Sequence, residues 1–411
     1  MGEGTVRRRA MTSVLIVSAA LAVLWVAQPW AQEAIKVGFV TSLTGPYGSL
    51  AEDQVRGLTL AQEEAAAQGG VLGRSVEILV RDDQVHPGEA AKKSKELIEK
   101  EKVHFLMGCI SAATELAMNE QAKRAGIPFF GVCQSNEINK APDRGPYTIH
   151  EALTPYMTAQ SLGVWIVQNL GKRWYFLAAD YAWGHQIYDS FVKVLEKHGG
   201  TNLGVTRFPL GSTDFTAYLP KIQAANPEVL IFAGAGRDME NAFKQMAAFG
   251  LKDKMKIVNP VSDLQFDIPI GFKILEGTYS SMHFSWELED QLPSAKRFVE
   301  GFRKRFGTPP SGYAGYAYSA MKSLLWAIEQ SGSIEPAKVA HALEGAELDW
   351  NRGRVWYRPC DHQAFQKNYI VRGRSEAEAK AKDKGEFGFR EIIATVDITE
   401  AYERTCAELG G

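Results

Sequence analysis

The feature that most constrains the fold is a regular alternation of short apolar runs with amphipathic stretches of helical periodicity. Four apolar runs come first, at 35–40, 76–80, 103–108 and 128–132. The amphipathic stretches between them lie at 50–68, 89–102 and 114–125. Glycine and proline mark the joins, as is typical where strands give way to helices. Strands that alternate with helices in this way predict an open parallel β-sheet.

A second series of the same kind follows, with apolar runs at 174–179, 205–208, 229–233 and 255–258. Two sheets of this size exceed a single hydrophobic core, so we predict an α/β protein with two doubly wound, Rossmann-like lobes and a ligand cleft between them. Beyond 293 the pattern becomes helical and then gives β-like segments at 354–358 and 367–371, which indicates that the chain recrosses between the lobes. The predicted first lobe comprises 34–150 and 283–345, and the second comprises 151–282 and 346–411.

The first thirty residues differ from all that follow. Three arginines at 7–9 precede an uncharged apolar stretch at 14–27. This order is typical of a secretory signal peptide, and the stretch is shorter than the roughly 20 apolar residues of a membrane-spanning helix. We therefore expect 1–31 to be a signal peptide that is cleaved, and the protein to reach the periplasm. A retained N-terminal anchor helix is the alternative, because Pro29 lies close to the expected cut after Ala31.

The charge balance excludes one class of partner. The chain has 46 Lys and Arg against 48 Asp and Glu, a formal net charge of -2. A nucleic-acid-binding protein needs a basic field that can neutralise phosphates. We therefore expect no nucleic-acid partner.

Four cysteines are present, Cys109, Cys133, Cys360 and Cys406, with no CxxC pair and no histidine at metal-ligand spacing. This pattern predicts no metal site. In an oxidising compartment, Cys360 and Cys406 are candidates for a disulfide that holds the C-terminal tail. Cys109 and Cys133 end two apolar runs, and we expect them to be free, buried thiols.

Ligands of open α/β sheets bind beyond the carboxyl ends of the strands, so the loops there are the places to search. The first such loop, at 41–48, contains Tyr47, which offers an aromatic face and a hydroxyl. The second, at 108–115, contains Ser111 and Thr114 at the start of a predicted helix, where free amide groups attract a carboxylate. A plain surface turn at Tyr47 and a simple helix cap at Ser111 are the structural alternatives.

A third loop of the predicted first lobe, at 132–136, contains Gln134 and Ser135, which are expected to bracket a polar ligand group. Turn formation alone would also account for Ser135. In the predicted second lobe, the loop at 179–184 contains two aromatic residues, Tyr181 and Trp183. Exposed aromatic side chains are costly, so we favour contact with an apolar ligand over packing between the lobes.

Two further loops occupy corresponding positions after later strands of the second lobe. Gly236 lies beside Arg237 at 234–238, and Asp263 ends the loop at 259–263. Arg237 could meet an anion and Asp263 a cation. A helix cap or a solvated group is the structural alternative for each.

By these residues the chain resembles the leucine/isoleucine/valine-binding family, the type I periplasmic solute-binding proteins of ABC importers. The resemblance covers nearly the whole chain after the signal segment. It rests on the order and spacing of segments that are unspecific alone, at 43–48, 69–74, 81–83, 108–114, 126–128 and 180–184. It implies two lobes that close on a small organic ligand, and a permease and an ATPase as partners.

The resemblance also implies the walls of the cleft. Ser111, Ala113, Thr114, Gln134 and Ser135 are expected to line one wall, and Trp183 with its neighbours the other. Amino-acid-binding members hold the ligand carboxylate with serine and threonine, and its ammonium group with an acidic residue of the second lobe.

This sequence departs from that pattern. Ala113 stands where those members have a serine, Gln134 replaces a small residue, and Val261 and Ser262 occupy the loop where a glutamate is expected. Asp263 is a possible substitute. The alternative is a ligand without an ammonium group, such as an aromatic or aliphatic carboxylate.

No pattern predicts catalysis or a cofactor. The loop at 41–48 lacks the GxGxxG of a dinucleotide site. The sequence Asp361-His362-Gln363 has no nucleophile beside it and lies far from any strand-to-helix loop, so we expect a structural histidine there. The chain is therefore predicted not to be an enzyme. A monomeric binding protein that delivers its ligand to an importer is expected, and a sensory module that presents its closed form to a chemoreceptor or sensor kinase is the alternative.

Overall fold

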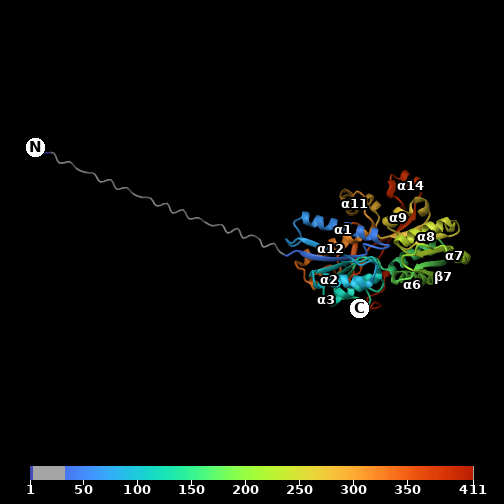
Figure 1. Cartoon of the computed structure of the whole chain (residues 1–411), viewed down its shortest axis with the longest axis horizontal. Helices are drawn as coiled ribbons and strands as arrows, with labels where there is room; N and C mark the ends of the chain where they lie inside the picture. Colours follow the sequence, from blue (N-terminus) through green and yellow to red (C-terminus); the bar gives the residue numbers. More distant parts are fainter. Residues whose placement is uncertain (3–32, 411) are drawn as a thin grey trace. The chain divides into compact units, whose positions relative to one another are not determined.

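The computed structural model describes residues 1–2 and 33–410, and Glu33–Gly411 form one compact unit (Figure 1). The predicted signal peptide at 1–31 lies outside the described residues, apart from its first two. Within the described part of the chain, no helix combines the length and the apolar character needed to cross a bilayer.

The first sheet has five parallel strands in the order β2-β1-β3-β4-β5. They are β1 (Ile35–Thr41), β2 (Val76–Asp82), β3 (Phe105–Gly108), β4 (Phe129–Gly131) and β5 (Thr148–His150). The helices that connect them are α1 (Gly48–Ala67), α2 (Pro87–Glu99) and α3 (Ala112–Ala125). β1 has a strand on each side and is buried along almost its whole length, which explains its uninterrupted apolar run.

The register brings the carboxyl ends of these strands to one edge. Gly108 pairs with Val40 on one side and with Gly131 on the other, and Gly131 pairs with His150. A Cβ at Gly108 would lie 2.1 Å from the carbonyl oxygen of Val40, so only glycine allows β3 to end here. The loops predicted to hold a ligand, at 41–48, 108–115 and 132–136, therefore leave the sheet side by side.

The second sheet has seven strands in the order β15-β14-β10-β9-β8-β6-β7. They are β6 (Arg173–Ala179), β7 (Thr201–Phe208), β8 (Val229–Ala233), β9 (Lys256–Asn259), β10 (Tyr279–Met282), β14 (Lys367–Gly373) and β15 (Arg390–Asp397). The first five run parallel, whereas β14 and β15 are antiparallel to their neighbours. The sheet is thus parallel with an antiparallel edge, and its strand β14 lies where a β-like segment is expected at 367–371.

Helices surround the second sheet. They include α4 (Pro155–Thr158), the π-helical turn η1 (Ala159–Gly163), α5 (Val164–Asn169), α6 (Ala182–Lys197), α7 (Leu219–Ala225), α8 (Gly236–Ala248), η2 (Leu251–Asp253), α9 (Leu264–Ile270), α10 (Phe272–Leu275) and η3 (Trp286–Asp290). The segment between β14 and β15 carries α14 (Glu376–Ala381), with a capping box at Ser375, and η4 (Gly385–Phe387). In Figure 1 the elements from α6 to α8 lie apart from α1, α2 and α3, as the prediction of two lobes requires.

The chain crosses between the two groups of elements three times, after β5, after β10 and before β14. After the second crossing come α11 (Pro293–Phe306), α12 (Gly312–Ser331) and α13 (Pro336–Leu343), and α12 packs along α1. A small antiparallel sheet follows, made of β11 (Glu347–Leu348), β12 (Val355–Tyr357) and β13 (Ala364–Phe365).

Two parts of 346–411, which the sequence assigns to the second lobe, contact the first group of elements. Gln363 forms a β-bridge with His150 at the end of β5. The tail after β15 contains η5 (Glu400–Tyr402), and its Leu409 carbonyl accepts a hydrogen bond of 2.9 Å from the amide of Ala141. The exact division of the chain between the lobes stays a prediction.

A buried ion pair holds the first crossing in place. The Glu151 carboxylate accepts from Arg352 Nη2 at 2.5 Å, from Ser319 Oγ at 2.6 Å and from the Tyr357 hydroxyl. Because Glu151 directly follows β5, these contacts fix the start of the crossing against α12 and the small sheet.

Both cysteine pairs form disulfides. Cys360 and Cys406, the predicted candidates, are joined with their Cα atoms 6.3 Å apart. Cys109 and Cys133 are also joined, with Cα atoms 5.8 Å apart, so the expectation of free thiols there is wrong. The reason is the register: β3 and β4 are neighbouring strands, and each cysteine lies just beyond the end of its strand.

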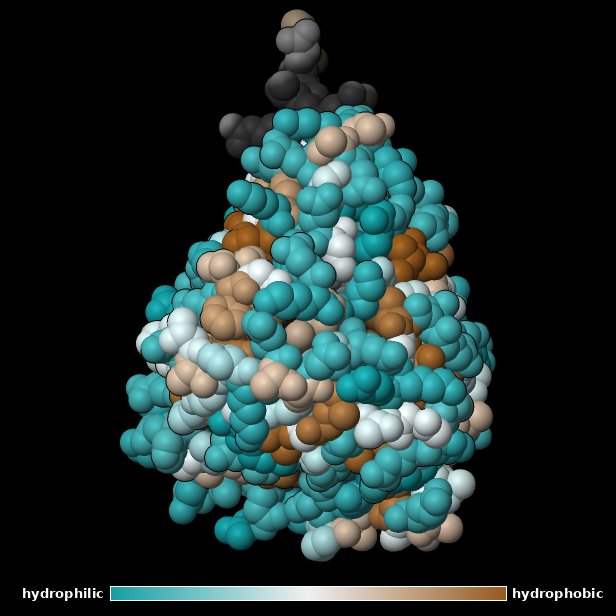
Figure 2. All heavy atoms as spheres, turned by 90° about the vertical axis from the view of Figure 1, so that its right-hand side faces the viewer, coloured by the Kyte–Doolittle hydropathy of each residue, from teal (hydrophilic) through white to brown (hydrophobic). Residues whose placement is uncertain are grey.

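Figure 2 views the protein from the side on which α6, α7 and α8 lie in Figure 1. That face is mostly hydrophilic, with small hydrophobic areas separated by polar side chains. Scattered apolar residues of this kind are normal on a soluble domain.

Candidate functional site

A pocket lies where the carboxyl ends of both parallel sheets face each other. It encloses about 350 Å³ of space between atoms, part of it open to solvent. Its lining is Tyr47, Leu50, Ile110, Gln134, Tyr181, Trp183, Ala235, Val261, Phe266 and Tyr313. Half of these side chains are aromatic, and none of them carries a charge. A mostly apolar lining with a few polar groups is typical of a small-molecule site.

Tyr47 and Tyr181 close the pocket from opposite sides. Tyr47 is buried just before α1 and Tyr181 stands at the N-terminal end of α6, and the two hydroxyl oxygens lie 3.1 Å apart. Burial raises the pKa of both hydroxyls above the ordinary tyrosine value. Both therefore stay protonated and can donate and accept hydrogen bonds.

Gln134 and Trp183 form a second link between the sides. The Trp183 indole N–H donates to Gln134 Oε1 at 3.0 Å, and Gln134 Nε2 donates to Thr158 Oγ1 at 3.3 Å. Trp183 is in the first turn of α6, so the helix start aims the indole at the loop after β4. Both predicted residues thus line the pocket and also hold each other.

The start of α3 brings Ser111, Ala113 and Thr114 together beside the pocket, although none of them lines it in this arrangement. Ser111 occupies the N-cap position of α3 but its side chain makes no capping hydrogen bond. Thr114 Oγ1 donates to the Ser111 carbonyl at 3.0 Å. The pocket-lining Ile110 directly precedes this turn, so the free end of the helix lies next to the pocket wall.

Ser135 and Gly236 lie near the pocket without lining it. Ser135 Oγ accepts a hydrogen bond of 3.2 Å from the Glu137 amide, which stabilises the turn after β4. At Gly236, with φ of +58°, a Cβ would lie 2.4 Å from the Pro46 carbonyl oxygen. Only glycine allows the start of α8 to approach the loop at 41–48 this closely.

Asp263 does not face the pocket. Its Oδ1 accepts from the Gln265 amide at 2.9 Å, and its Oδ2 accepts from the Gly312 and Tyr313 amides at 2.8 and 3.3 Å. Both carboxyl oxygens are therefore engaged with the backbone. Arg237 is exposed at the start of α8 and is likewise outside the pocket lining.

Six lining residues had not been singled out as ligand contacts: Leu50, Ile110, Ala235, Val261, Phe266 and Tyr313. Ile110, Ala235 and Val261 lie in loops that the sequence marks as strand ends, so their location was predictable although their contact was not. Leu50, Phe266 and Tyr313 come from helices. Tyr313 starts α12, which only the second crossing brings to the pocket.

The geometry is that of a two-lobed ligand trap, and comparison with known proteins agrees. Residues 34–380 match the family model of the periplasmic binding proteins, and the chain belongs to that family. Within it, the chain is a type I binding protein of the leucine/isoleucine/valine-binding group, as the resemblance predicted. Membership of a solute-binding family also confirms that the chain is not an enzyme.

Individual relatives are distant. The Leu/Ile/Val-binding protein homolog 7 of Brucella abortus (strain 2308) is 26% identical over 345 residues, which cover 79% of this chain and 84% of that protein. An amino acid ABC transporter substrate-binding protein from Pseudomonas fluorescens Pf-5 has a TM-score of 0.84 and 24% identity, and covers 93% of this chain and 99% of that one.

A solute binding protein of an ABC transporter from Rhodopseudomonas palustris BisB5, in complex with 3,4-dihydroxy benzoic acid, has a TM-score of 0.80 and 23% identity. The match covers 89% of this chain and 98% of that one. These solved structures confirm the predicted two-lobed α/β fold.

Proposed function

We propose that this protein captures a small aromatic carboxylate in the periplasm and delivers it to an ABC importer. One observation carries the choice of ligand. The pocket walls are aromatic, and Asp263, the acidic residue that the sequence offered for an ammonium group, has both oxygens bonded to backbone amides. A leucine-like amino acid would have to bury its ammonium group without a charged partner, which is costly.

The pocket supplies contacts of the right kind for such a ligand. Trp183, Tyr181 and Phe266 offer apolar faces on the side of the second sheet. On the side of the first sheet, the Gln134 amide and the uncapped start of α3 at Ser111 offer donors for a carboxylate. The solved relative with 3,4-dihydroxy benzoic acid bound supports the same ligand class for this chain.

The test is a thermal-shift screen of the purified protein. Benzoate and 3,4-dihydroxybenzoate form one arm, and leucine and isoleucine form the other. A ligand at about one hundred times its dissociation constant adds about 2.7 kcal/mol of stability, which is readily measured. Stabilisation by the aromatic acids alone is the expected result, and stabilisation by the amino acids alone would overturn the proposed ligand class.

Two variants of Trp183 sharpen this test. Trp183→Ala removes the aromatic face and is expected to weaken binding of the aromatic acid in calorimetry by about tenfold or more. Trp183→Phe keeps an aromatic face but lacks the indole N–H that donates to Gln134, so it is expected to bind more tightly than the alanine variant. Equal affinity of all three proteins would remove Trp183 from the site.

A further inference from the structure

Asp263 joins the two halves of the cleft although it does not touch the pocket. It follows β9 of the second sheet and caps α9, whereas its Oδ2 accepts from the first amides of α12, Gly312 and Tyr313. α12 packs along α1, which covers the first sheet. The contact between Asp263 and the start of α12 therefore spans the cleft.

The start of α12 is shaped to receive this side chain. A Cβ at Gly312 would lie 3.0 Å from Asp263 Oδ2 and 2.6 Å from His283 Nε2. Any other residue would displace the His283 ring and crowd the carboxyl group. The first amides of a helix have no partner within the helix, and the positive end of its dipole favours an acceptor there. Asp263 supplies that acceptor from the other side of the cleft.

Both sides of this contact carry a wall of the pocket. Tyr313, whose amide donates to Asp263, lines the pocket. Phe266, in the first turn of the helix that Asp263 caps, lines it too, and the two rings meet edge to face with centroids 6.4 Å apart. The position of Asp263 therefore fixes two aromatic walls relative to each other.

We propose that Asp263 is a positioning residue, a latch whose carboxyl group fastens α9 to the start of α12 when the lobes close and so sets the affinity for a ligand it never contacts. The proposal concerns the same pocket and rests on the proposed function as a ligand trap. It does not depend on which ligand the pocket takes.

The groups that face the Asp263 carboxyl are few. They are Asp53 on α1, Asp267 on α9, His283 after β10 and Tyr313 on α12. Asp267 is paired with Arg390 at 2.8 Å. Burial lowers the pKa of His283 to about 3, and the nearby Arg352 charge lowers it too, so its ring is neutral.

Burial, together with Asp53 and Asp267, raises the pKa of Asp263 to about 7. Below that pH the buried carboxyl is largely protonated. A protonated carboxyl still accepts through one oxygen, so it can bond both amides without the cost of a buried charge. The latch is therefore expected to work best at mildly acidic pH.

The test compares Asp263→Ala with Asp238→Ala at about pH 6, without ligand. Asp238 is a fitting control because it is a buried carboxyl in the first turn of α8 whose hydrogen bond, to the Gly211 amide at 3.1 Å, stays on its own side of the cleft. Hydrogen exchange of the peptide that contains Gly312 and Tyr313 reports the latch itself. Small-angle scattering reports opening of the lobes.

We expect Asp263→Ala to speed exchange at the start of α12 and to increase the radius of gyration, whereas Asp238→Ala leaves both unchanged. Asp263→Asn keeps an acceptor oxygen and is expected to restore most of the protection of the Gly312 and Tyr313 amides from exchange. It replaces the alanine variant in the test if that variant folds poorly. Unchanged exchange and scattering in Asp263→Ala would overturn the latch. These two measurements need no ligand. They therefore test the latch even if the proposed ligand class is wrong.

Ligand affinity completes the test. With 3,4-dihydroxybenzoate as the probe, Asp263→Ala is expected to bind at least about tenfold more weakly, because two hydrogen bonds of the closed form are lost. If the variant opens but binds the probe as tightly as the unchanged protein, the latch does not set affinity.

Discussion

At the scale of single residues, Ser111 is the clearest case of a side chain that is placed for a helix cap but does not form one. It occupies an N-cap position, where a serine hydroxyl normally accepts from the helix backbone, yet no such hydrogen bond is present. Removing the Ser111 hydroxyl is therefore expected to cost the ligand-free protein little stability. A free hydroxyl at the end of a helix beside a pocket suits the carboxylate of a ligand.

We expect Ser111→Ala to leave the melting temperature of the ligand-free protein unchanged and to weaken ligand binding by roughly 1 kcal/mol, the usual value of one hydrogen bond. Thermal melting with and without the aromatic acid measures both effects. An equal loss of stability in the two conditions would mean that Ser111 serves the helix and not the ligand.

Asp263 gives a prediction of pH dependence. Its pKa is about 7 when buried between the lobes, whereas a carboxyl group in water has a pKa of about 3.9. Closure therefore takes up a proton between these pH values. Binding of this proton stabilises the closed form fully below about pH 3.9. The stabilisation is lost as the pH rises through about 7.

The radius of gyration of the ligand-free protein is thus expected to increase between about pH 4 and about pH 7. Asp263→Asn cannot titrate, so its radius is expected to change less over the same range. Identical profiles for the two proteins would show that another group controls the change.

At the scale of elements, the disulfide between Cys109 and Cys133 joins the two loops that carry Ser111 and Gln134. The cysteines are separated by 24 residues. Closing a loop of that length in the unfolded chain is expected to contribute about 3 kcal/mol to the free energy of unfolding.

Replacing both Cys109 and Cys133 with serine is therefore expected to lower the denaturant midpoint by an amount that corresponds to about 3 kcal/mol. Replacing Cys360 and Cys406 instead is a comparison, because that bond holds the C-terminal tail and does not join the two loops directly. We expect ligand affinity to fall more in the first double variant than in the second. Reaction of the unchanged, unfolded protein with a thiol reagent would contradict the disulfides.

The elements themselves show where sequence reasoning works. The parallel strands from β1 to β4 and from β6 to β9 were predicted within a few residues, because buried strands read as apolar runs. β10 was missed because two of its residues are serines, so it does not read as an apolar run. Ser280 Oγ donates to the Asn259 carbonyl, and Ser281 Oγ donates to the Pro260 carbonyl. Their polar atoms are satisfied locally, so the strand is buried without looking apolar.

The site was predicted in part for a related reason. Tyr47, Gln134, Tyr181 and Trp183 were found because they lie between the end of a strand and the first turn of the next helix, at the edge where the pocket is. Tyr313 escaped notice because nothing local to the sequence places the start of α12 there. Asp263 was found at the correct loop, but its hydrogen bonds to α12 depend on the approach of the two lobes.

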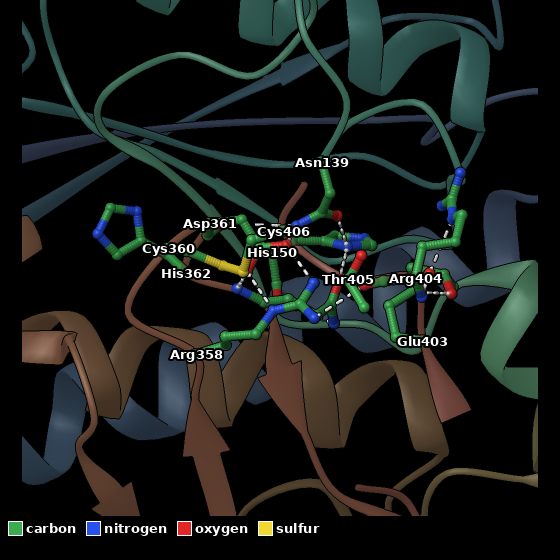
Figure 3. A network of polar contacts seen from close by, with 12 residues as sticks. Asn139, His150, Arg358, Cys360, Asp361, His362, Glu403, Arg404, Thr405 and Cys406 are labelled. Carbon is green, nitrogen blue, oxygen red and sulfur yellow. Dashed lines mark hydrogen bonds and ion pairs between the residues drawn. A yellow bond between two sulfur atoms is a disulfide. The ribbon is translucent and has the colours of Figure 1, made fainter. Parts of the chain in front are cut away.

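At the scale of the whole molecule, the C-terminal tail ties the parts together. Figure 3 shows the polar network that surrounds it, in which Arg358 pairs with Asp361 at 2.6 Å and the Cys360–Cys406 disulfide lies alongside. Asp361 also accepts from Asn139, whose Oδ1 lies 3.0 Å from His150. This accounts for the Asp361-His362-Gln363 sequence as a structural feature.

Arg404 connects the tail to the ligand loop. Its Nη2 donates to the Asn136 carbonyl at 2.9 Å, and the side chain of Asn136 donates to Ser190 of α6 at 3.1 Å. Asn136 is thus held by the tail and by the opposite side of the cleft at once. Arg404→Ala is expected to reduce ligand affinity several-fold and to speed hydrogen exchange at 134–137.

Arg305→Ala is a suitable control, because Arg305 is exposed, forms an ion pair with Glu63 at 3.0 Å, and lies over the ring of the neighbouring Phe306. Exposed pairs of this kind contribute little to stability. If both variants behave alike, the tail does not position the loop.

The return of the tail has a practical consequence. Glu33 lies just before β1 of the first sheet, and the Leu409 carbonyl accepts a hydrogen bond from Ala141, which lies between β4 and β5 of the same sheet. A surface tether attached through Glu33 or Leu409 would thus be held close to the first sheet. With a dye on the second lobe, such a tethered protein would report ligand binding without any added reagent. The protein is therefore a suitable scaffold for a biosensor.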